Sequence, residues 1–207
     1  MYKVYGKLCQ DYSLQSADNF MDVGLLVSLS IQQNWLKCGT MLQDVRENGI
    51  DSKYLWGGKA KTYSYLLRNK HMLFGQLKAI RASNKSDEEK AYSLMKIYLR
   101  IDGLGIPKAG FLCQLTLGLV GCMDSHNIKM YKLNPNALMI VKNPKGFKAL
   151  ETNRIKIVNY INLCHTIGTE TLWDKWCNNL ATKSSKWLDG NHVSKVHFDY
   201  LSGACEK

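Results

Sequence analysis

The sequence is poor in the features that mark membrane, secreted and disordered proteins. Only three of its 207 residues are proline, and no segment is of low complexity, so we expect neither long linkers nor disorder. The longest apolar runs, residues 20–31 and 109–123, are shorter than the roughly 20 residues of a membrane span. The first residues also lack the apolar core of a signal peptide. We therefore expect a soluble, cytoplasmic protein that does not enter a membrane.

Paired cysteines are missing as well. The seven cysteines are scattered along the chain without a C-x-x-C pair, which is typical of reduced thiols and argues against a disulfide framework or a zinc site. His165, His192 and His197 form no metal-ligand pattern either. We expect no metal and no cofactor.

Acidic residues are few relative to basic ones. The chain has 28 Lys and Arg against 17 Asp and Glu, a formal net charge of +11. Such an excess favours polyanionic partners, with nucleic acid first and anionic membranes second. Residues 50–82 interleave basic and aromatic side chains, as nucleic-acid surfaces do. The competing interpretation is a solvated basic face whose aromatic rings turn to the core.

Nearly every periodic segment predicts a helix, and 45% of the residues are hydrophobic, enough for a substantial core. We expect one all-α domain over residues 1–207. Asp18 is a candidate N-cap for a buried helix over 20–31, and Ser86 and Glu89 have the spacing of a capping box. Further helices are expected to end near 47 and 101 and to span 108–119, 125–132, 147–165, 170–183 and 191–202.

A glycine turn organises the middle of the chain, where residues 101–109 read I-D-G-L-G-I-P-K-A. We expect positive φ within Gly103-Leu104-Gly105, which few residues other than glycine adopt. Pro107 suits the first turn of the helix that follows. Such a turn exposes backbone N–H groups and the positive end of a helix dipole, and together these bind a phosphate. The contact would position DNA without reading its sequence.

One carboxylate, Asp124, follows about a helix length later, in M-D-S-H-N. From the residues alone it has two interpretations: a catalytic group at the mouth formed by the turn, or the N-cap of the next helix.

Together these motifs resemble the helix-hairpin-helix superfamily of DNA glycosylases, of the endonuclease III and AlkA type. The resemblance implies two helical lobes around a cleft, one over about 20–132 and the other formed by the N-terminus with about 147–207. It implies that Asp124 is the catalytic aspartate. Its DNA contacts would be Gly103, Leu104, Gly105, Ile106, Lys108 and His126, together with Gln33 or Gln32.

The glutamines are assigned from L-V-S-L-S-I-Q-Q-N, residues 26–34, which is similar to the superfamily's L-L-S-x-Q-T segment. In relatives a glutamine at this break enters the space that the flipped nucleotide leaves. The alternative for Gln32 and Gln33 is a polar turn between two helices.

The chain also departs from the superfamily pattern. Lys108 falls one residue after the position of the nucleophilic lysine of strand-cleaving members, and one residue is about 100° of helix rotation. We therefore expect its amine to point away from the sugar and to contact phosphate. Asp102 replaces the usual proline. The C-terminal cysteines lack the spacing of an iron–sulfur cluster.

These departures favour a monofunctional, monomeric glycosylase that binds double-stranded DNA and removes a damaged or modified base. The short chain without a cluster resembles small bacteriophage members of the superfamily. Some of these are associated with thymidine hypermodification, so one alternative is action on a 5-substituted pyrimidine without base release. The other alternative is a DNA-binding module without catalysis.

Overall fold

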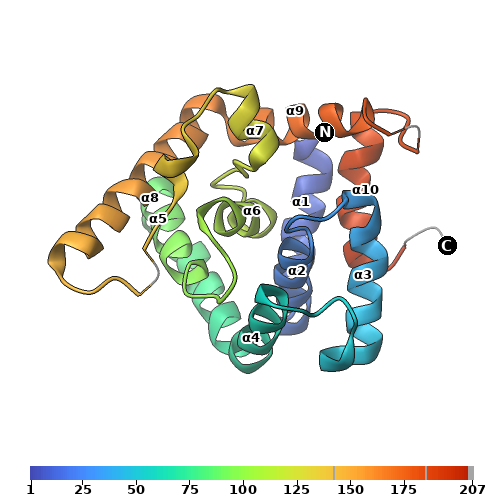
Figure 1. The fold of residues 1–207 in the computed structure, drawn as a ribbon, viewed down its shortest axis with the longest axis horizontal. Helices are drawn as coiled ribbons and strands as arrows, with labels where there is room; N and C mark the ends of the chain where they lie inside the picture. Colours follow the sequence, from blue (N-terminus) through green and yellow to red (C-terminus); the bar gives the residue numbers. More distant parts are fainter. Residues whose placement is uncertain (142, 185, 205–207) are drawn as a thin grey trace.

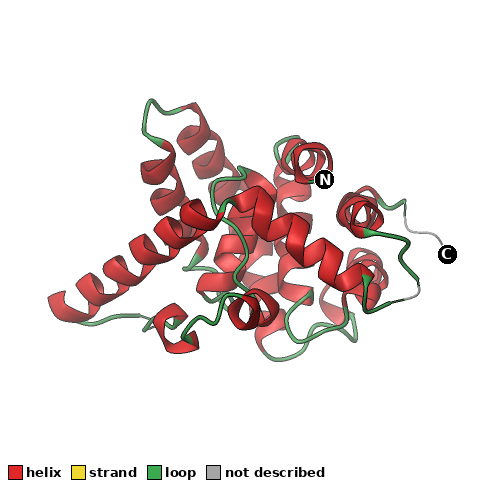
Figure 2. Ribbon diagram, turned by 90° about the horizontal axis from the view of Figure 1, so that it is seen from above, coloured by secondary structure: helices red, strands yellow, loops and turns green. Residues whose placement is uncertain are grey.

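The computed structural model describes residues 1–141, 143–184 and 186–204, and within these ranges it is built from helices without any β-strand (Figures 1 and 2). The all-α class expected from the sequence is therefore confirmed. In chain order, the elements are α1 (Tyr2–Ser13), α2 (Ala17–Leu29), α3 (Trp35–Asn48), the 3-10 turn η1 (Gly49–Asp51), α4 (Gly58–Ala82), α5 (Asp87–Tyr98), α6 (Ile106–Thr116), α7 (Ser125–Met130), the 3-10 turn η2 (Pro135–Leu138), α8 (Phe147–Ile167), α9 (Thr169–Ala181) and α10 (Gly190–Ser202).

Local side-chain chemistry explains where several helices begin. The capping box that opens α5 is confirmed, because Ser86 Oγ accepts the Glu89 N–H at 3.2 Å and Glu89 Oε2 accepts the Ser86 N–H at 2.9 Å. The expected N-cap of α2 was wrong. Ser16, with extended backbone, accepts the Asn19 N–H at 3.0 Å, and Asp18 lies in the first turn, where it pairs with Lys70 of α4.

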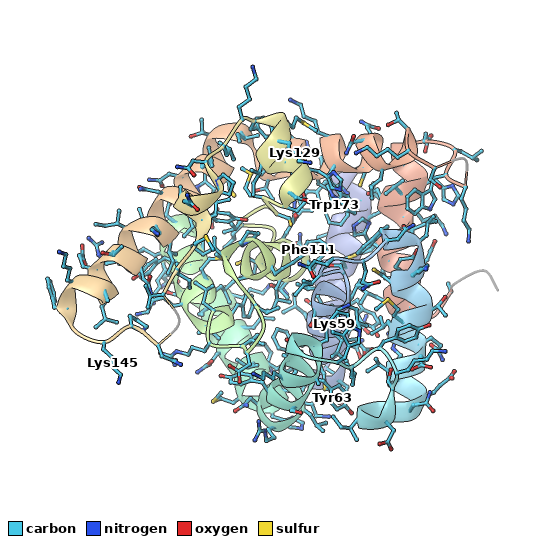
Figure 3. All side chains as sticks on the ribbon, in the orientation of Figure 1. Lys59, Tyr63, Phe111, Lys129, Lys145 and Trp173 are labelled. Atoms are coloured by element: carbon cyan, nitrogen blue, oxygen red, sulfur yellow. The ribbon has the colours of Figure 1, made fainter. Side chains whose placement is uncertain are left out.

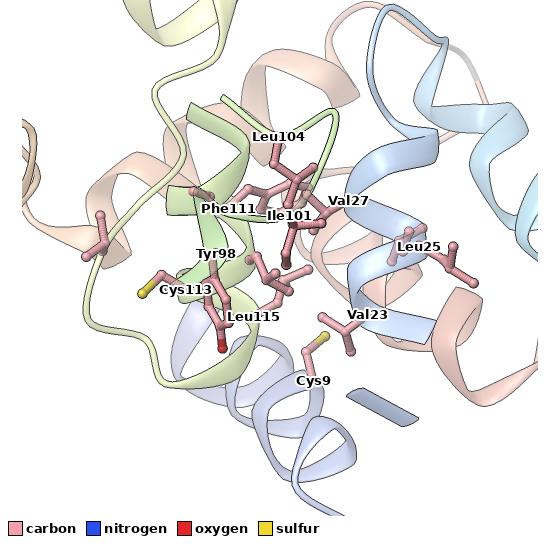
Figure 4. Close-up of a cluster of buried hydrophobic side chains, with 14 of the residues drawn as sticks. Cys9, Val23, Leu25, Val27, Tyr98, Ile101, Leu104, Phe111, Cys113 and Leu115 are labelled. Carbon is pink, nitrogen blue, oxygen red and sulfur yellow. The ribbon is translucent and has the colours of Figure 1, made fainter. Parts of the chain in front are cut away.

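Helices α2 and α6 form the centre of the molecule. Nine of the eleven residues of α6 are buried, since other helices surround it, and a helix that is apolar all round is stable only in such a position. Helix α2 packs on α4, α6, α1 and α3. Figure 4 shows Leu104 and Ile101, from the glycine turn, among the buried side chains near Val27 of α2. The turn is therefore anchored in the core.

The two ends of the chain pack together. Helix α1 lies against α10 and α6, and α10 lies against α9 (Figure 1). Arg46 of α3 links this part to α2, because it binds Asp22 at 2.7 Å and donates to the carbonyl of Leu201 at 2.6 Å. Across the described residues, no helix has the length and apolarity needed to cross a bilayer.

Candidate functional site

The turn between α5 and α6 requires glycine at one position but not at the other. Gly103 has φ +86°, and an added Cβ would lie 2.5 Å from Thr62 Oγ1 and 2.7 Å from the Gly58 carbonyl oxygen. Positive φ is thus confirmed at Gly103. The expectation of positive φ is wrong at Gly105, which has φ −98° and ψ 179°. This is extended backbone that any residue can adopt.

Gly105 instead leaves the start of α6 uncovered. It is the N-cap residue, it has no side chain to accept from the first N–H groups, and an added Cβ would meet only Pro107 Cδ, at 3.9 Å. The first N–H groups of a helix have no partner within the helix. Leu104 and Ile106 are buried, so the part of the turn that faces solvent consists of Gly103, Gly105 and the acidic residue Asp102. This arrangement can bind an anion through N–H groups and the helix dipole.

Lys108 lies in the first turn of α6. Its side chain is half-buried, its Nζ donates to Ser30 Oγ at 2.9 Å, and the amine lies 5.3 Å from the centroid of the Phe111 ring. The end of α2 supplies Ser30 as its partner, so the amine turns inward. It lines the same cavity as Asp124.

That cavity has a volume of about 650 Å³ and gathers segments from across the chain. Its lining comes from the α2–α3 connection, the start of α6, the segment around α7 and the helices α9 and α10. The five expected site residues outside the turn lie in its wall: Asp124, Lys108, His126, Gln32 and Gln33. The other expected contacts, Gly103–Ile106, adjoin it through Pro107, which is also a lining residue.

Asp124 is the N-cap of α7 and also lies in the wall of the cavity. Its Oδ1 accepts the N–H groups of His126 at 2.9 Å and Asn127 at 3.0 Å, so it is the N-cap of α7. Its Oδ2 accepts the indole N–H of Trp176 at 2.9 Å. Three N–H donors therefore hold one carboxylate at the cavity wall, with no cation paired to it among the described ion pairs.

Aromatic rings form the deep part of the cavity. The ring of His197 lies between those of Trp35 and Trp173, at centroid distances of 4.4 and 4.2 Å. Trp176 and Phe111 approach the same imidazole edge-on, and Figure 3 labels Phe111 and Trp173 near the middle of the molecule. Such walls suit a flat, uncharged ring system, which stacks on aromatic faces.

His197 is a neutral group in this setting. Burial lowers its pKa to about 3. Its Nδ1 lies 2.9 Å from the Val193 carbonyl and so carries the proton, whereas Nε2 has no partner among the described residues. A neutral imidazole with the proton on Nδ1 offers an acceptor at Nε2.

The glutamines and His126 lie at the margins of the cavity. Gln32 is exposed and has φ +53°, a left-handed conformation uncommon outside glycine. Gln33 is half-buried, and both residues line the cavity at the break between α2 and α3. His126 is half-buried, and its Nδ1 lies 3.5 Å from Lys183 Nζ.

Sequence reasoning missed several residues that build the site. Ser30, which binds Lys108, and Trp176, which binds Asp124, belong to segments far from their partners in the sequence. The spacing of the tryptophans in α9 is typical of residues on the buried face of a helix. Trp173 is indeed buried, but it and Trp176 also line the cavity. Five tryptophans in 207 residues, four of them in the wall, were the available signal.

Comparison with known proteins yields no relative from which a function could be transferred: neither a protein family, nor a curated protein, nor a solved structure matches this chain.

Proposed function

We propose that the protein is a DNA N-glycosylase that takes one flipped nucleotide into the aromatic cavity. One observation carries the proposal: Asp124, Lys108 and the Gln32–Gln33 break line a single aromatic cavity beside a glycine turn with uncapped helix N–H groups. Each of these groups has a task in breaking a glycosidic bond in duplex DNA.

The duplex is held by its phosphates. The net charge of +11 attracts the polyanion, and the N–H groups at the start of α6 bind one phosphate without reading a base. Since Pro107 and Lys108 belong both to the first turn of α6 and to the cavity wall, a strand held here passes the mouth of the cavity.

The nucleotide must leave the stack before its glycosidic bond can be reached. A volume of about 650 Å³ lies within the range of about 300–1,000 Å³ typical of small-molecule sites. Stacking on aromatic rings contributes about 1–3 kcal/mol per base, which offsets part of the unstacking energy. Gln33 or Gln32, at the margin, fills the space left in the duplex.

Asp124 acts on the sugar. When the bond between C1′ and the base nitrogen breaks, its electron pair leaves with the base and C1′ becomes cationic. A carboxylate fixed by three N–H donors stabilises that charge without reorganising. Water then bonds to C1′ through its oxygen and Asp124 receives the proton, while the departing base, which carries the electron pair, takes up a proton from solvent. The products are the free base and an abasic sugar.

The position of Lys108 favours a second candidate, a glycosylase that also cleaves the strand. Its amine points into the cavity towards Ser30. An amine that attacks C1′ forms a Schiff base with the sugar and releases the base. Reduction with borohydride would trap this intermediate as a covalent protein–DNA adduct.

Incubation with duplexes that carry different damaged or 5-modified bases tests the proposal. Mass spectrometry of the products detects free base, which the glycosylase releases. A change in nucleoside mass without release would replace the proposal by base modification. Binding without any product across the panel would replace it by a DNA-binding module.

A further inference from the structure

The start of α4 lies against the glycine turn and is itself made of glycines. Gly57 is the N-cap of α4, has φ +55° and makes no side-chain capping bond. An added Cβ on Gly58 would lie 3.9 Å from the Gly103 Cα. Thr62 of α4 donates to the Asp102 carbonyl at 2.5 Å, which fixes the turn to the helix. The N-terminal end of α4 therefore lies against the glycine turn that precedes α6.

The glycine edge at the start of α4 has free space in front of it. An added Cβ on Gly57 meets nothing within 4 Å, and Gly57, Gly58 and Gly103 are exposed. The first N–H groups of a helix lack intrahelical partners and carry the positive end of its dipole. Neither α4 nor α6 has a capping side chain. At α4 the Lys59 N–H donates to the Trp56 carbonyl at 3.1 Å, so the N–H groups of the exposed residues Gly57 and Gly58 are the ones open to an anion.

A buried lysine without a partner belongs to the same end of α4. Lys59 is only 4% exposed, and its Nζ has no hydrogen-bond partner among the described residues. The Nζ lies 4.9 Å from the centroid of the Trp56 ring, and Trp56 directly precedes the cap of the helix. The ammonium is thus held beside the ring of the residue that precedes the N-cap of α4. An unpaired buried charge is unfavourable. An anion bound at this end of the helix would pair with the ammonium.

A second lysine, Lys108, also contributes positive charge near Lys59. Burial raises the pKa of the Cys38 thiol to about 12, and the charges of Lys108 and Lys59 both oppose that rise. The two amines therefore act on the same buried thiol, one from the cavity and one from α4. Asp102 is the acidic residue of the turn, and its side chain is exposed.

We propose that Gly57, Gly58 and Lys59 form a second phosphate-binding site, which holds a further phosphate of the strand bound by the Gly103–Gly105 turn. The inference rests on the proposed function only in taking DNA as the ligand. On binding, the Lys59 ammonium exchanges the Trp56 ring for a phosphate oxygen. Trp56, which is 55% exposed, then offers its ring face to a neighbouring base or sugar.

Substitution of Lys59 by methionine distinguishes a phosphate-binding role of this lysine from a purely structural one. The variant removes a buried, unpaired charge at similar volume, so the thermal midpoint should be unchanged or higher. Duplex affinity, measured by fluorescence anisotropy at several salt concentrations, should fall. One lost phosphate contact lowers the slope of log affinity against log salt by about 0.9, so the advantage of the wild type should shrink about 3.5-fold between about 50 and 200 mM salt.

Lys7→Met is the matched control, because Lys7 is already paired with Asp11 on α1. Its slope should equal that of the wild type. If Lys59→Met folds poorly, Gly58→Ala serves instead, since its added Cβ has no neighbour closer than 3.9 Å and adds bulk only at the glycine edge. It should weaken duplex binding at an unchanged thermal midpoint.

Inorganic phosphate and vesicles of anionic phospholipid identify the source of the phosphate. We expect duplex DNA and, more weakly, inorganic phosphate to shift the amide resonances of Gly57, Gly58 and Lys59. Vesicles that compete with the duplex for these amides would overturn the assignment to DNA. So would a slope for Lys59→Met equal to that of Lys7→Met. If base is released but the salt slope of Lys59→Met equals that of the wild type, the second phosphate site is refuted and the glycosylase proposal stands. If the slope is lowered but no base is released, the glycosylase proposal is refuted and the phosphate site stands.

Discussion

Alanine at Gly103 should destabilise the protein, whereas alanine at Gly105, two residues later, should leave its stability almost unchanged. At φ +86°, a residue with a Cβ is less favourable by about 1–2 kcal/mol. The new methyl would also lie 2.5 Å from Thr62 Oγ1 and 2.7 Å from the Gly58 carbonyl oxygen, and such overpacking costs about 1–3 kcal/mol. Together these terms predict a loss of about 2–5 kcal/mol in the free energy of unfolding.

Gly105 provides the internal control. Its φ of −98° suits any residue, and its nearest neighbour would be 3.9 Å away, so the change in stability should stay within about 0.5 kcal/mol. Urea denaturation measures both variants. At the same time Gly105→Ala should weaken binding to all duplexes alike, since its methyl group covers N–H groups that read no base. Equal stability of Gly103→Ala and Gly105→Ala would contradict the strain and crowding at position 103. An effect of Gly105→Ala that depends on the DNA sequence would contradict a phosphate contact at position 105.

Two further predictions concern the cavity. If the Lys108 amine is the nucleophile, the covalent DNA adduct trapped by borohydride should disappear in both Lys108→Ala and Lys108→Arg. An adduct that persists in these variants would show that the amine is not the nucleophile. The absence of any adduct in the wild type would restore the monofunctional assignment. His197, whose pKa is lowered to about 3 by burial, binds a proton more readily in the unfolded chain, at about 6.5. The contribution of neutral His197 to the free energy of unfolding should therefore be fully present above pH 6.5 and be lost as the pH falls towards 3. The loss should be about 2 kcal/mol between pH 6.5 and pH 5. Denaturation of His197→Phe, which lacks the titrating group, should show a shallower pH dependence; an identical profile would contradict the buried neutral imidazole.

The helical architecture could be predicted because its signals are local. The capping box of Ser86 and Glu89, the glycine at position 103 and Pro107 each act within a few residues of the chain, and each has its expected structural role. The misplaced cap shows the limit of such signals. Ser16 and Asp18 are both good N-caps, and the pairing of Asp18 with Lys70, far along the chain, is invisible in local sequence.

The cavity could be predicted only in part, because its geometry depends on long-range packing. The sequence suggested Asp124 and Lys108, but the direction of the Lys108 amine depends on Ser30, across the α2–α3 break. Likewise Trp176 binds Asp124 from α9. His197 carried no signal at all, because a histidine gains its role here from the two tryptophans that enclose it.

The rate of base release by Asp124→Asn tests most directly whether this carboxylate stabilises the cleaved sugar. Asparagine can still cap α7, although its amide cannot accept from both α7 and Trp176 in the same way, so about 1 kcal/mol of stability should be lost. Asp189→Asn, at the N-cap of α10, controls for the cap alone and should release base at the wild-type rate. For Asp124→Asn we predict a rate about 10²–10³ lower, with duplex binding retained. Base release by Asp124→Asn at the wild-type rate would contradict the mechanism.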